Sequence, residues 1–348
     1  MTFQDIVVFG RENDASDIHF TVGCEPIFRI NGDLVRMEGF ENFLVTNRLV
    51  LSILDAAQEE KLRAGEDLDF VFELSTGERQ RVNTFRAMGK LACSCRLLNN
   101  TLLTLEELNL PPIIKDLSKK RNGLILVTGA TGSGKTTTLS LLVDFINRSR
   151  ACHIITIEDP VEYRHQSKLA TIHQREVGRD VKSFDYALRS SLREDPDVIL
   201  VGELRDYETM QLAVTAAATG HLVLGTLHTR GAAHTVSRIV DACPKEIQHQ
   251  MMIQLSQAVE CIISQALLPR EDGRGRIAAL EIMLGTDAVR NIIRSEKTHQ
   301  LESTMQQSKA HGMCILDDEI LGHYRKGLIT KNTALDYAND RPTMASKI

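Results

Sequence analysis

The sequence predicts an α/β protein in which a small α+β unit precedes a mainly parallel sheet covered by helices. Its 348 residues correspond to two domains at about 150 residues each. The first hundred residues contain short stretches of alternating apolar and polar side chains, whereas residues 123–224 alternate apolar runs with helical patterns. With 43% hydrophobic and 25% charged residues, the chain has the composition of a folded protein with a sizeable core.

The first unit is predicted to consist of strands joined by tight turns, with one helix. The strands are expected at residues 17–22, 28–30, 34–37, 68–74, 80–85 and 91–97. Asn31-Gly32 favours a hairpin turn, and apolar residues at helical spacing predict a helix over residues 47–63. Pro111 and Pro112 stop helices and stiffen the chain, so we expect residues 99–112 to form a linker.

The second unit is predicted to build its sheet from four apolar runs, at residues 123–127, 153–157, 198–201 and 221–224. Helices are expected between these runs, at residues 135–147, 184–192 and 207–219. Gly220 ends the last of these helices. From about residue 287 the pattern is helical to the end of the sequence.

Charge, cysteine content and hydropathy argue against several classes of protein. A net charge of −5 and 5% aromatic residues without Trp argue against nucleic-acid binding by bulk charge or by stacking. Seven scattered cysteines without a CxxC pair favour reduced thiols over a disulfide framework or a zinc site. Because no apolar stretch approaches about 18 residues and the N-terminus lacks the pattern of a signal peptide, we expect a cytoplasmic protein.

A phosphate-binding loop at residues 129–136 is the motif that carries the chemistry. It fits G-x-x-x-x-G-K-[ST] in full, follows an apolar strand and precedes a helix. Its glycines let backbone N–H groups face phosphate oxygens, Lys135 can reach the β- and γ-phosphates, and Thr136 can ligate Mg²⁺. The residues expected to bind the nucleoside triphosphate are Gly129, Ala130, Thr131, Gly132, Ser133, Gly134, Lys135, Thr136 and Thr137.

Further polar residues follow other apolar runs. Glu203 ends its strand at the carboxyl edge of the sheet, where ligands gather, although it could instead cap the next helix. Glu158, Asp159 and Glu162 form an acidic cluster that either surrounds a cation or belongs to a salt-bridge network. His228 also ends an apolar run, and without context a lone histidine there is more often a core or capping residue.

Together these blocks resemble the secretion ATPases of type II and type IV systems over essentially the whole chain. The blocks similar to the family's Walker A, Asp box, Walker B and His box are residues 129–136, 158–162, 195–203 and 219–229. Residues 15–19 and 29–32 look like the start of its PAS-like N-terminal domain. The resemblance therefore implies a PAS-like domain, a linker, a RecA-like P-loop ATPase domain and a helical part, at residues 1–98, 99–112, 113–286 and 287–348.

The resemblance also implies roles for single residues. Glu203 would polarise the attacking water, Glu158 with the rest of the Asp box would organise Mg²⁺, and which of the two is the principal base stays open. His228 would read the γ-phosphate. Since Gly202 stands where other P-loop enzymes carry a magnesium-binding Asp, contact from this strand is expected through water. Arginines from the N-terminal domain or a neighbouring subunit would contact the phosphates, the candidates being Arg81, Arg96, Arg193, Arg205, Arg230 and Arg238.

Within the family, residues 288–300 are similar to the A-I-R-N-L-I-R-E block of pilus retraction ATPases. Arg290, Asn291 and Arg294 keep that pattern, whereas Val289, Ile293 and Ser295 depart from it. Helical spacing alone predicts an apolar face at 288, 289, 292 and 293, with the basic residues at 290, 294 and 297 on a polar face. The compact N-terminus and the lack of a tetracysteine insertion also favour retraction over pilus assembly.

The resemblance implies a homo-hexameric motor that hydrolyses ATP with Mg²⁺ and powers type IV pilus retraction and twitching motility through rotation between domains. Its partners would be an inner-membrane platform protein and, indirectly, pilin, with no nucleic acid. Membrane association would be through these partners only, at the cytoplasmic face of the inner membrane. Two alternatives stay open: a related secretion or pilus-assembly ATPase, and a nucleotide-gated interaction protein with little turnover.

Overall fold

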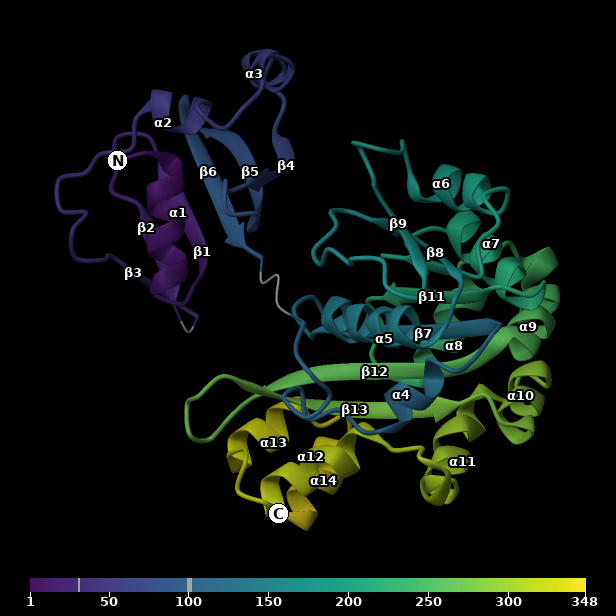
Figure 1. The fold of residues 1–348 in the computed structure, drawn as a ribbon. Coiled ribbons are helices and arrows are strands. Elements are labelled where there is room, and N and C mark those ends of the chain that lie inside the picture. Colours follow the sequence, from purple (N-terminus) through teal and green to yellow (C-terminus); the bar gives the residue numbers. More distant parts are fainter. Residues whose placement is uncertain (31, 99–101) are drawn as a thin grey trace. The chain divides into compact units, whose positions relative to one another are not determined.

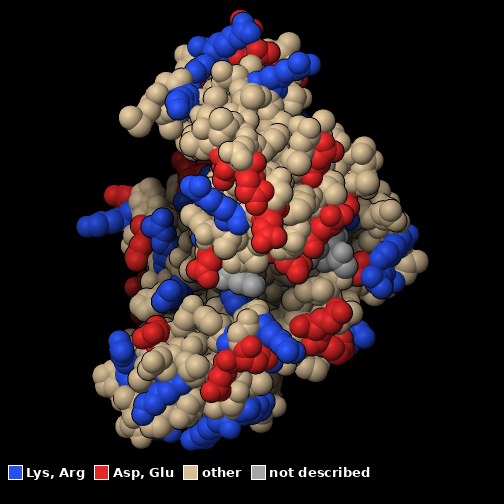
Figure 2. Space-filling view, turned by 90° about the vertical axis from the view of Figure 1, so that its left-hand side faces the viewer, with Lys and Arg blue, Asp and Glu red and all other residues tan. Residues whose placement is uncertain are grey.

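The computed structural model describes residues 1–30, 32–98 and 102–348, and the chain divides into two compact units, Met1–Thr101 and Leu102–Ile348 (Figure 1). Asn31 of the predicted hairpin turn and the first three residues of the predicted linker lie outside the described residues. Within the described ranges, no helix has both the length and the apolar character that crossing a membrane requires. On the face drawn in Figure 2, basic and acidic side chains are both spread over the surface.

The first unit is an antiparallel sheet with helices packed on it. Its strands are β1 (Ala15–Thr21), β2 (Ile27–Ile30), β3 (Asp33–Val35), β4 (Leu68–Glu73), β5 (Arg79–Ala87) and β6 (Lys90–Leu97). They are ordered β3-β2-β1-β6-β5-β4, and each neighbouring pair is antiparallel. Helix α1 (Phe3–Glu12) packs on the sheet, where the Phe3 and Phe20 rings stack with centroids 4.6 Å apart.

The single helix predicted over residues 47–63 is wrong, because the structure has two helices there. They are α2 (Asn47–Leu51) and α3 (Ala56–Arg63). Asp55 accepts a hydrogen bond from the Gln58 N–H at 2.8 Å, and the Gln58 side chain accepts from the Asp55 N–H at 3.0 Å. This capping box starts a second helix and breaks the apolar pattern that had suggested one continuous element.

The second unit is built on a seven-stranded sheet. Its strands are β7 (Gly123–Thr128), β8 (His153–Glu158), β9 (Thr171–Glu176), β10 (Val198–Val201), β11 (Leu222–Leu227), β12 (Val259–Pro269) and β13 (Arg276–Leu284). They are ordered β13-β12-β7-β11-β10-β8-β9, and only the β12–β13 pair is antiparallel among these neighbours. The sequence did not predict β9, β12 or β13.

Helices cover both faces of this sheet, which confirms the predicted fold class. The helices are α4 (Ile113–Leu117), α5 (Lys135–Ser149), α6 (Phe184–Ser191), α7 (Tyr207–Ala218), α8 (Ala232–Asp241), α9 (Lys245–Ala258), α10 (Asp287–Arg294), α11 (Leu301–Gln307), α12 (Leu316–Arg325), α13 (Lys331–Tyr337) and α14 (Arg341–Lys347). Alternate residues of β7 enter two cores: Ile125 and Val127 pack with α5, and Leu124 and Leu126 pack with α7 to α9. The last helices, α12 to α14, share a core with β12 and β13.

The described part of the predicted linker packs on this second unit. Leu105 and Leu110 are buried in the same core as α4 and α5. Pro112 is the N-cap of α4, so the proline pair introduces a short helix at this point. Residues 102–112 therefore belong structurally with the unit that carries the phosphate loop.

Candidate nucleotide-binding site

The loop between β7 and α5 has the backbone shape of a phosphate cradle. Gly129, Gly132 and Gly134 have φ values of 140°, 77° and 86°, which glycine adopts at little cost. A Cβ at Gly129 would lie 2.3 Å from the Gln265 carbonyl oxygen, so a larger residue does not fit. The buried Ser133 hydroxyl has no partner among the described residues, which leaves it available to an oxygen-rich ligand. The first turn of α5 therefore offers its N–H groups to an anion.

Lys135, the first residue of α5, folds back over this loop. Its Nζ donates to the carbonyl oxygens of the first two loop residues at 2.9 and 3.0 Å, and lies 3.5 Å from His228 Nδ1. Burial lowers the pKa of Lys135, while the carboxylates of Glu203 and Glu162 act in the opposite direction. The Lys135 ammonium is thus held at the mouth of the loop, between the backbone oxygens and the carboxylates of Glu203 and Glu162.

Glu203 and His228 meet beside this lysine, because they follow the adjacent parallel strands β10 and β11. His228 Nε2 lies 3.2 Å from Glu203 Oε1, so the imidazole stands between the lysine and the glutamate. A neutral imidazole with its proton on Nε2 satisfies both contacts. Arg205 Nε donates to Glu203 Oε2 at 2.7 Å. Four of the residues singled out in the sequence therefore form one cluster.

Glu158 is the last residue of β8 and is only 6% exposed. Its Oε1 accepts a hydrogen bond from Thr156 Oγ1 at 2.6 Å and another from Gln174 Nε2 at 3.2 Å. The chain just after β10, the neighbouring strand in the sheet, comes very close to the end of β8. A Cβ at Gly202 would lie 3.1 Å from the Ile157 carbonyl oxygen and 3.3 Å from the Glu158 Cα. Glycine at 202 therefore allows the chain after β10 to lie close against the backbone at the end of β8, the strand that carries Glu158.

The other two acidic residues of this block lie on the loop after β8. Asp159 is exposed, and Glu162 is partly buried and acts electrostatically on Lys135. Between β8 and β9, Tyr163 is buried, and its Oη lies 3.1 Å from the Thr137 hydroxyl. This contact joins the loop to the first turn of α5.

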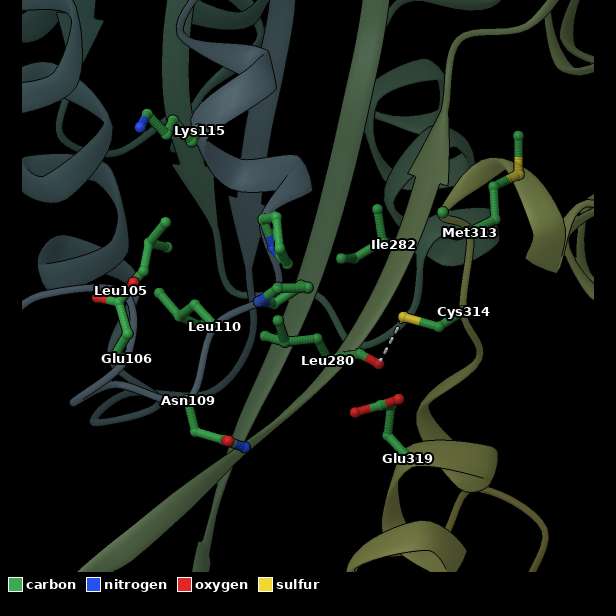
Figure 3. Close-up of a pocket in the computed structure, with 13 residues that line it drawn as sticks. Leu105, Glu106, Asn109, Leu110, Lys115, Leu280, Ile282, Met313, Cys314 and Glu319 are labelled. Atoms are coloured by element: carbon green, nitrogen blue, oxygen red, sulfur yellow. Dashed lines mark hydrogen bonds between the residues drawn. The ribbon is translucent and has the colours of Figure 1, made fainter.

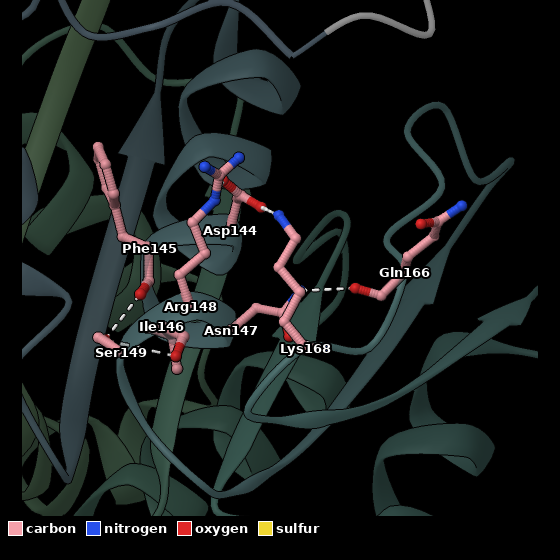
Figure 4. Close-up of polar contacts among 8 residues, drawn as sticks. All are labelled: Asp144, Phe145, Ile146, Asn147, Arg148, Ser149, Gln166 and Lys168. Carbon is pink, nitrogen blue, oxygen red and sulfur yellow. Dashed lines mark hydrogen bonds and ion pairs between the residues drawn. The ribbon is translucent and has the colours of Figure 1, made fainter.

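The far end of α5 also holds this loop, as Figure 4 shows. Buried Asn147 donates from Nδ2 to the Gln166 carbonyl oxygen at 2.8 Å, and its Oδ1 accepts from the Lys168 N–H at 2.9 Å. Asp144 pairs with Lys168 at 2.8 Å and with Arg148 at 2.6 Å. The sequence pattern marked none of these residues, since each supports the site from the opposite end of a helix.

Two candidate arginines, Arg81 and Arg96, lie on the sheet of the first unit. Arg81 on β5 pairs with Asp69 at 2.6 Å, and Arg96 on β6 pairs with Asp17 at 3.0 Å. Both side chains are substantially exposed despite these partners. The structure therefore shows each arginine bound to a carboxylate within its own unit.

The remaining candidate arginines belong to the second unit. Arg230 is exposed and lines a cavity of about 190 Å³ that also includes residues 130–133 of the phosphate loop. Arg193 and Arg238 are exposed at the end of α6 and on α8. Two candidates of this unit are thus placed near the loop: Arg205, which contacts Glu203, and Arg230.

The basic residues of the block at 288–300 do not form one row on the polar face of a single helix, which corrects the expectation. Arg290 is partly buried: its Nε donates to the Gly285 carbonyl oxygen at 2.7 Å, and its guanidinium pairs with Glu260 and bonds the Gln257 carbonyl oxygen. Glu260 also pairs with Lys120 at 2.6 Å. Arg290 therefore ties α10 to the start of β12.

The rest of this block matches the expectation only in part. Val289 and Ile293 are buried and Ile292 is partly buried, but Ala288 is exposed. Asn291 and Arg294 are exposed on α10. Lys297 lies beyond the end of that helix, because the chain turns at Ser295 and Glu296.

A cavity of about 630 Å³, larger than the one beside the phosphate loop, lies elsewhere in the second unit (Figure 3). It is lined by Leu105 and Leu110, by Leu280 and Ile282 of β13, and by Cys314, whose thiol donates to the Leu280 carbonyl oxygen at 3.3 Å. None of the site residues predicted from the sequence lines it. Size alone therefore does not mark the functional site of this protein.

A phosphate loop after β7, with His228 after the neighbouring strand β11 and Glu203 after β10, the strand beyond it, defines a P-loop ATPase with a RecA-like fold. The family model described as Type II/IV secretion system protein matches residues 3–325. The chain belongs to that family.

Named relatives place the chain more closely within the family. The type IV pilus retraction ATPase PilT of Pseudomonas aeruginosa is 43% identical over 340 residues, which cover 97% of this chain and 98% of that protein. A twitching motility protein of Neisseria gonorrhoeae is 44% identical over 323 residues, covering 92% and 86%. The crystal structure of the pilus retraction motor PilT with bound ADP superposes with a TM-score of 0.91 at 41% identity, over 99% of each chain.

Proposed function

We propose that this protein is an ATP-driven motor that retracts type IV pili and thereby powers twitching motility. The observation that carries the proposal is the contact of His228 with both Glu203 and Lys135 at the mouth of the phosphate loop. Similarity to a retraction ATPase over nearly the full length of both chains supports the direction of the work.

The side chains of the cluster divide the chemistry among themselves. The N–H groups of residues 129–137 and the ammonium of Lys135 bind the phosphates. Glu203 accepts the proton of the attacking water or polarises it, and Arg205 and His228 hold its two carboxylate oxygens in place. His228 contacts the γ-phosphate, because its ring lies between the lysine and Glu203.

The donors near the loop fit Mg²⁺, which prefers oxygen ligands. Thr136 supplies a hydroxyl in the first turn of α5, and Glu158 supplies a carboxylate at the end of β8. Asp159 and Glu162 add negative charge beside them. When bound, the cation neutralises charge on the phosphates.

The motor as a whole is a homo-hexamer in this proposal. Residues 1–98 form a PAS-like domain, 99–112 connect it to the RecA-like domain at 113–286, on which residues 102–112 pack, and 287–348 form a helical part. Arginines complete each nucleotide site, drawn from Arg81, Arg96, Arg193, Arg205, Arg230 and Arg238. Arg290, Asn291 and Arg294 serve the retraction role, and the ring acts on an inner-membrane platform protein from the cytoplasmic side and, through it, on pilin.

A replacement of the chromosomal gene by a Glu203→Gln copy tests the proposal. We expect abundant surface pili without twitching, because assembly continues while retraction fails, and phosphate release by the purified variant should fall at least about 100-fold. A Glu208→Gln copy, altered at an exposed residue of α7, should twitch normally. Loss of pili, or a secretion defect at an unchanged pilus count, would instead favour the assembly or export role.

A further inference from the structure

Gln174 lies beside the carboxylate of Glu158 without belonging to any motif of the site. It is on β9, which pairs in parallel with β8, and the register places it opposite Thr156. Because side chains two residues apart in a strand share a face, Thr156 and Glu158 point to the same side of β8. The side chains of Thr156 and Gln174 both reach Glu158 Oε1 from this side.

The amide of Gln174 makes three hydrogen bonds. Nε2 donates to Glu158 Oε1 at 3.2 Å and to the Tyr163 carbonyl oxygen at 2.8 Å. Oε1 accepts from the His165 N–H at 2.8 Å. Two acceptors on one side and a donor on the other fix the amide in one orientation.

We propose that Gln174 is a positioning residue for Glu158, an inference that rests on the proposed role of Glu158 at the magnesium site. Two donors on one carboxylate oxygen set the direction in which the other oxygen points. An amide does this without adding a positive charge of its own beside Glu158. The same amide also bonds to the backbone of residues 163 and 165, and so it fixes the path of the loop that follows β8.

The first test replaces Gln174 by a side chain of equal size that cannot donate a hydrogen bond. Gln174→Glu removes the donor and places a second carboxylate beside Glu158, so the Glu158 carboxylate loses its fixed orientation. We expect kcat to fall about tenfold. KM for ATP should stay within about twofold, because the phosphate loop is unchanged. Gln211→Glu, the same change at an exposed residue of α7, is the matched control and should leave kcat and KM unchanged.

A double-mutant cycle tests whether Gln174 acts through Glu158. Gln174→Met keeps the length of the side chain without its hydrogen bonds, and we expect it to lower kcat about tenfold in the native background. In a Glu158→Gln background the same change should have little further effect, because the carboxylate that it positions is gone.

The outcomes separate this inference from the proposed function. If Glu158→Gln retains full kcat, the role of Glu158 fails and the inference fails with it. If Glu158→Gln is inactive but the Gln174 changes leave kcat unchanged, or add independently to the loss in the cycle, only the inference is overturned. Melting temperatures of all variants, measured alongside, show whether a loss of kcat reflects unfolding.

Discussion

Lys135 is the residue on which phosphate binding depends, and its environment predicts a pH effect. Burial lowers its pKa below the value of about 10.4 of an ordinary lysine, so the free protein loses this positive charge at a lower pH. We expect the association rate of a fluorescent ADP analogue to be flat near neutral pH and to fall as the pH rises, at a lower pH than an ordinary lysine would give. Stopped-flow measurements on the free protein report this limb directly.

The control for this effect is Lys135→Gln, which carries no ammonium at any pH. Its association rate should be low and should lack the alkaline limb. If the native protein and this variant lose association in parallel as the pH rises, another group is responsible and the assignment to Lys135 is wrong.

At single positions, the sequence was enough to identify functional residues that act together within one short segment of the chain. Glycines and a lysine at fixed spacing in one loop are readable, because one short segment must wrap one phosphate chain. Gln174 and Thr156 were not readable as a pair, since they meet only through the register of β8 and β9. Arg290 was misplaced because its partners, Glu260 and the Gln257 carbonyl, lie about 30 residues earlier in the chain.

Among the elements, α5 supports the site at both ends, and a substitution of Asn147 tests this support. Asn147→Ala would leave the Gln166 carbonyl and the Lys168 N–H without their partner. We expect a loss of about 2 kcal/mol in unfolding free energy and faster proteolysis within residues 164–170. Urea denaturation and timed digestion measure these effects. Ser149→Ala, at an exposed position of the same helix, should change stability by less than about 0.5 kcal/mol.

Helix α10 gives a second prediction at this scale. Arg290→Ala removes bonds to two carbonyl oxygens and to Glu260, and we expect it to lower the free energy of unfolding by about 1–2 kcal/mol. Arg294→Ala, at an exposed position of the same helix, should leave stability within about 0.5 kcal/mol. Thermal melts compare the two. Equal melting temperatures would mean that Arg290 does not anchor the helix.

Four strands of the second unit could be predicted from the sequence, because their residues form continuous apolar runs. Strands β7, β8, β10 and β11 are buried on both faces and read as plain apolar runs. Strand β9 is an edge strand with polar side chains, so its period was too weak to see. The break between α2 and α3 depends on one capping box, which a periodicity search passes over.

For the whole molecule, a mixing experiment tests the proposed hexamer and the origin of its arginines. Lys135→Ala and Arg96→Ala subunits should each be inactive alone. If Arg96 acts across a subunit interface, random mixing in equal amounts restores about a quarter of the sites, since each needs one intact lysine and one intact neighbour. Phosphate release after subunit exchange measures the recovery.

The control mixture combines Lys135→Ala with Glu203→Gln subunits. Both defects lie in the same site of the same chain, so no arrangement of these subunits restores an intact pair. Recovery in this control would show that the two residues act in different subunits. No recovery in the Arg96 mixture would place that arginine's action within its own chain.

The close approach at Gly202 bears on how such motors diverge over time. Because a Cβ there would lie 3.1 Å from the Ile157 carbonyl oxygen and 3.3 Å from the Glu158 Cα, a change to aspartate requires the end of β8 to move by a few tenths of an ångström. Such a change therefore disturbs the backbone that carries Glu158 in the same step that adds a carboxylate beside it. Substitution at 202 and the use of Glu158 are coupled in this fold.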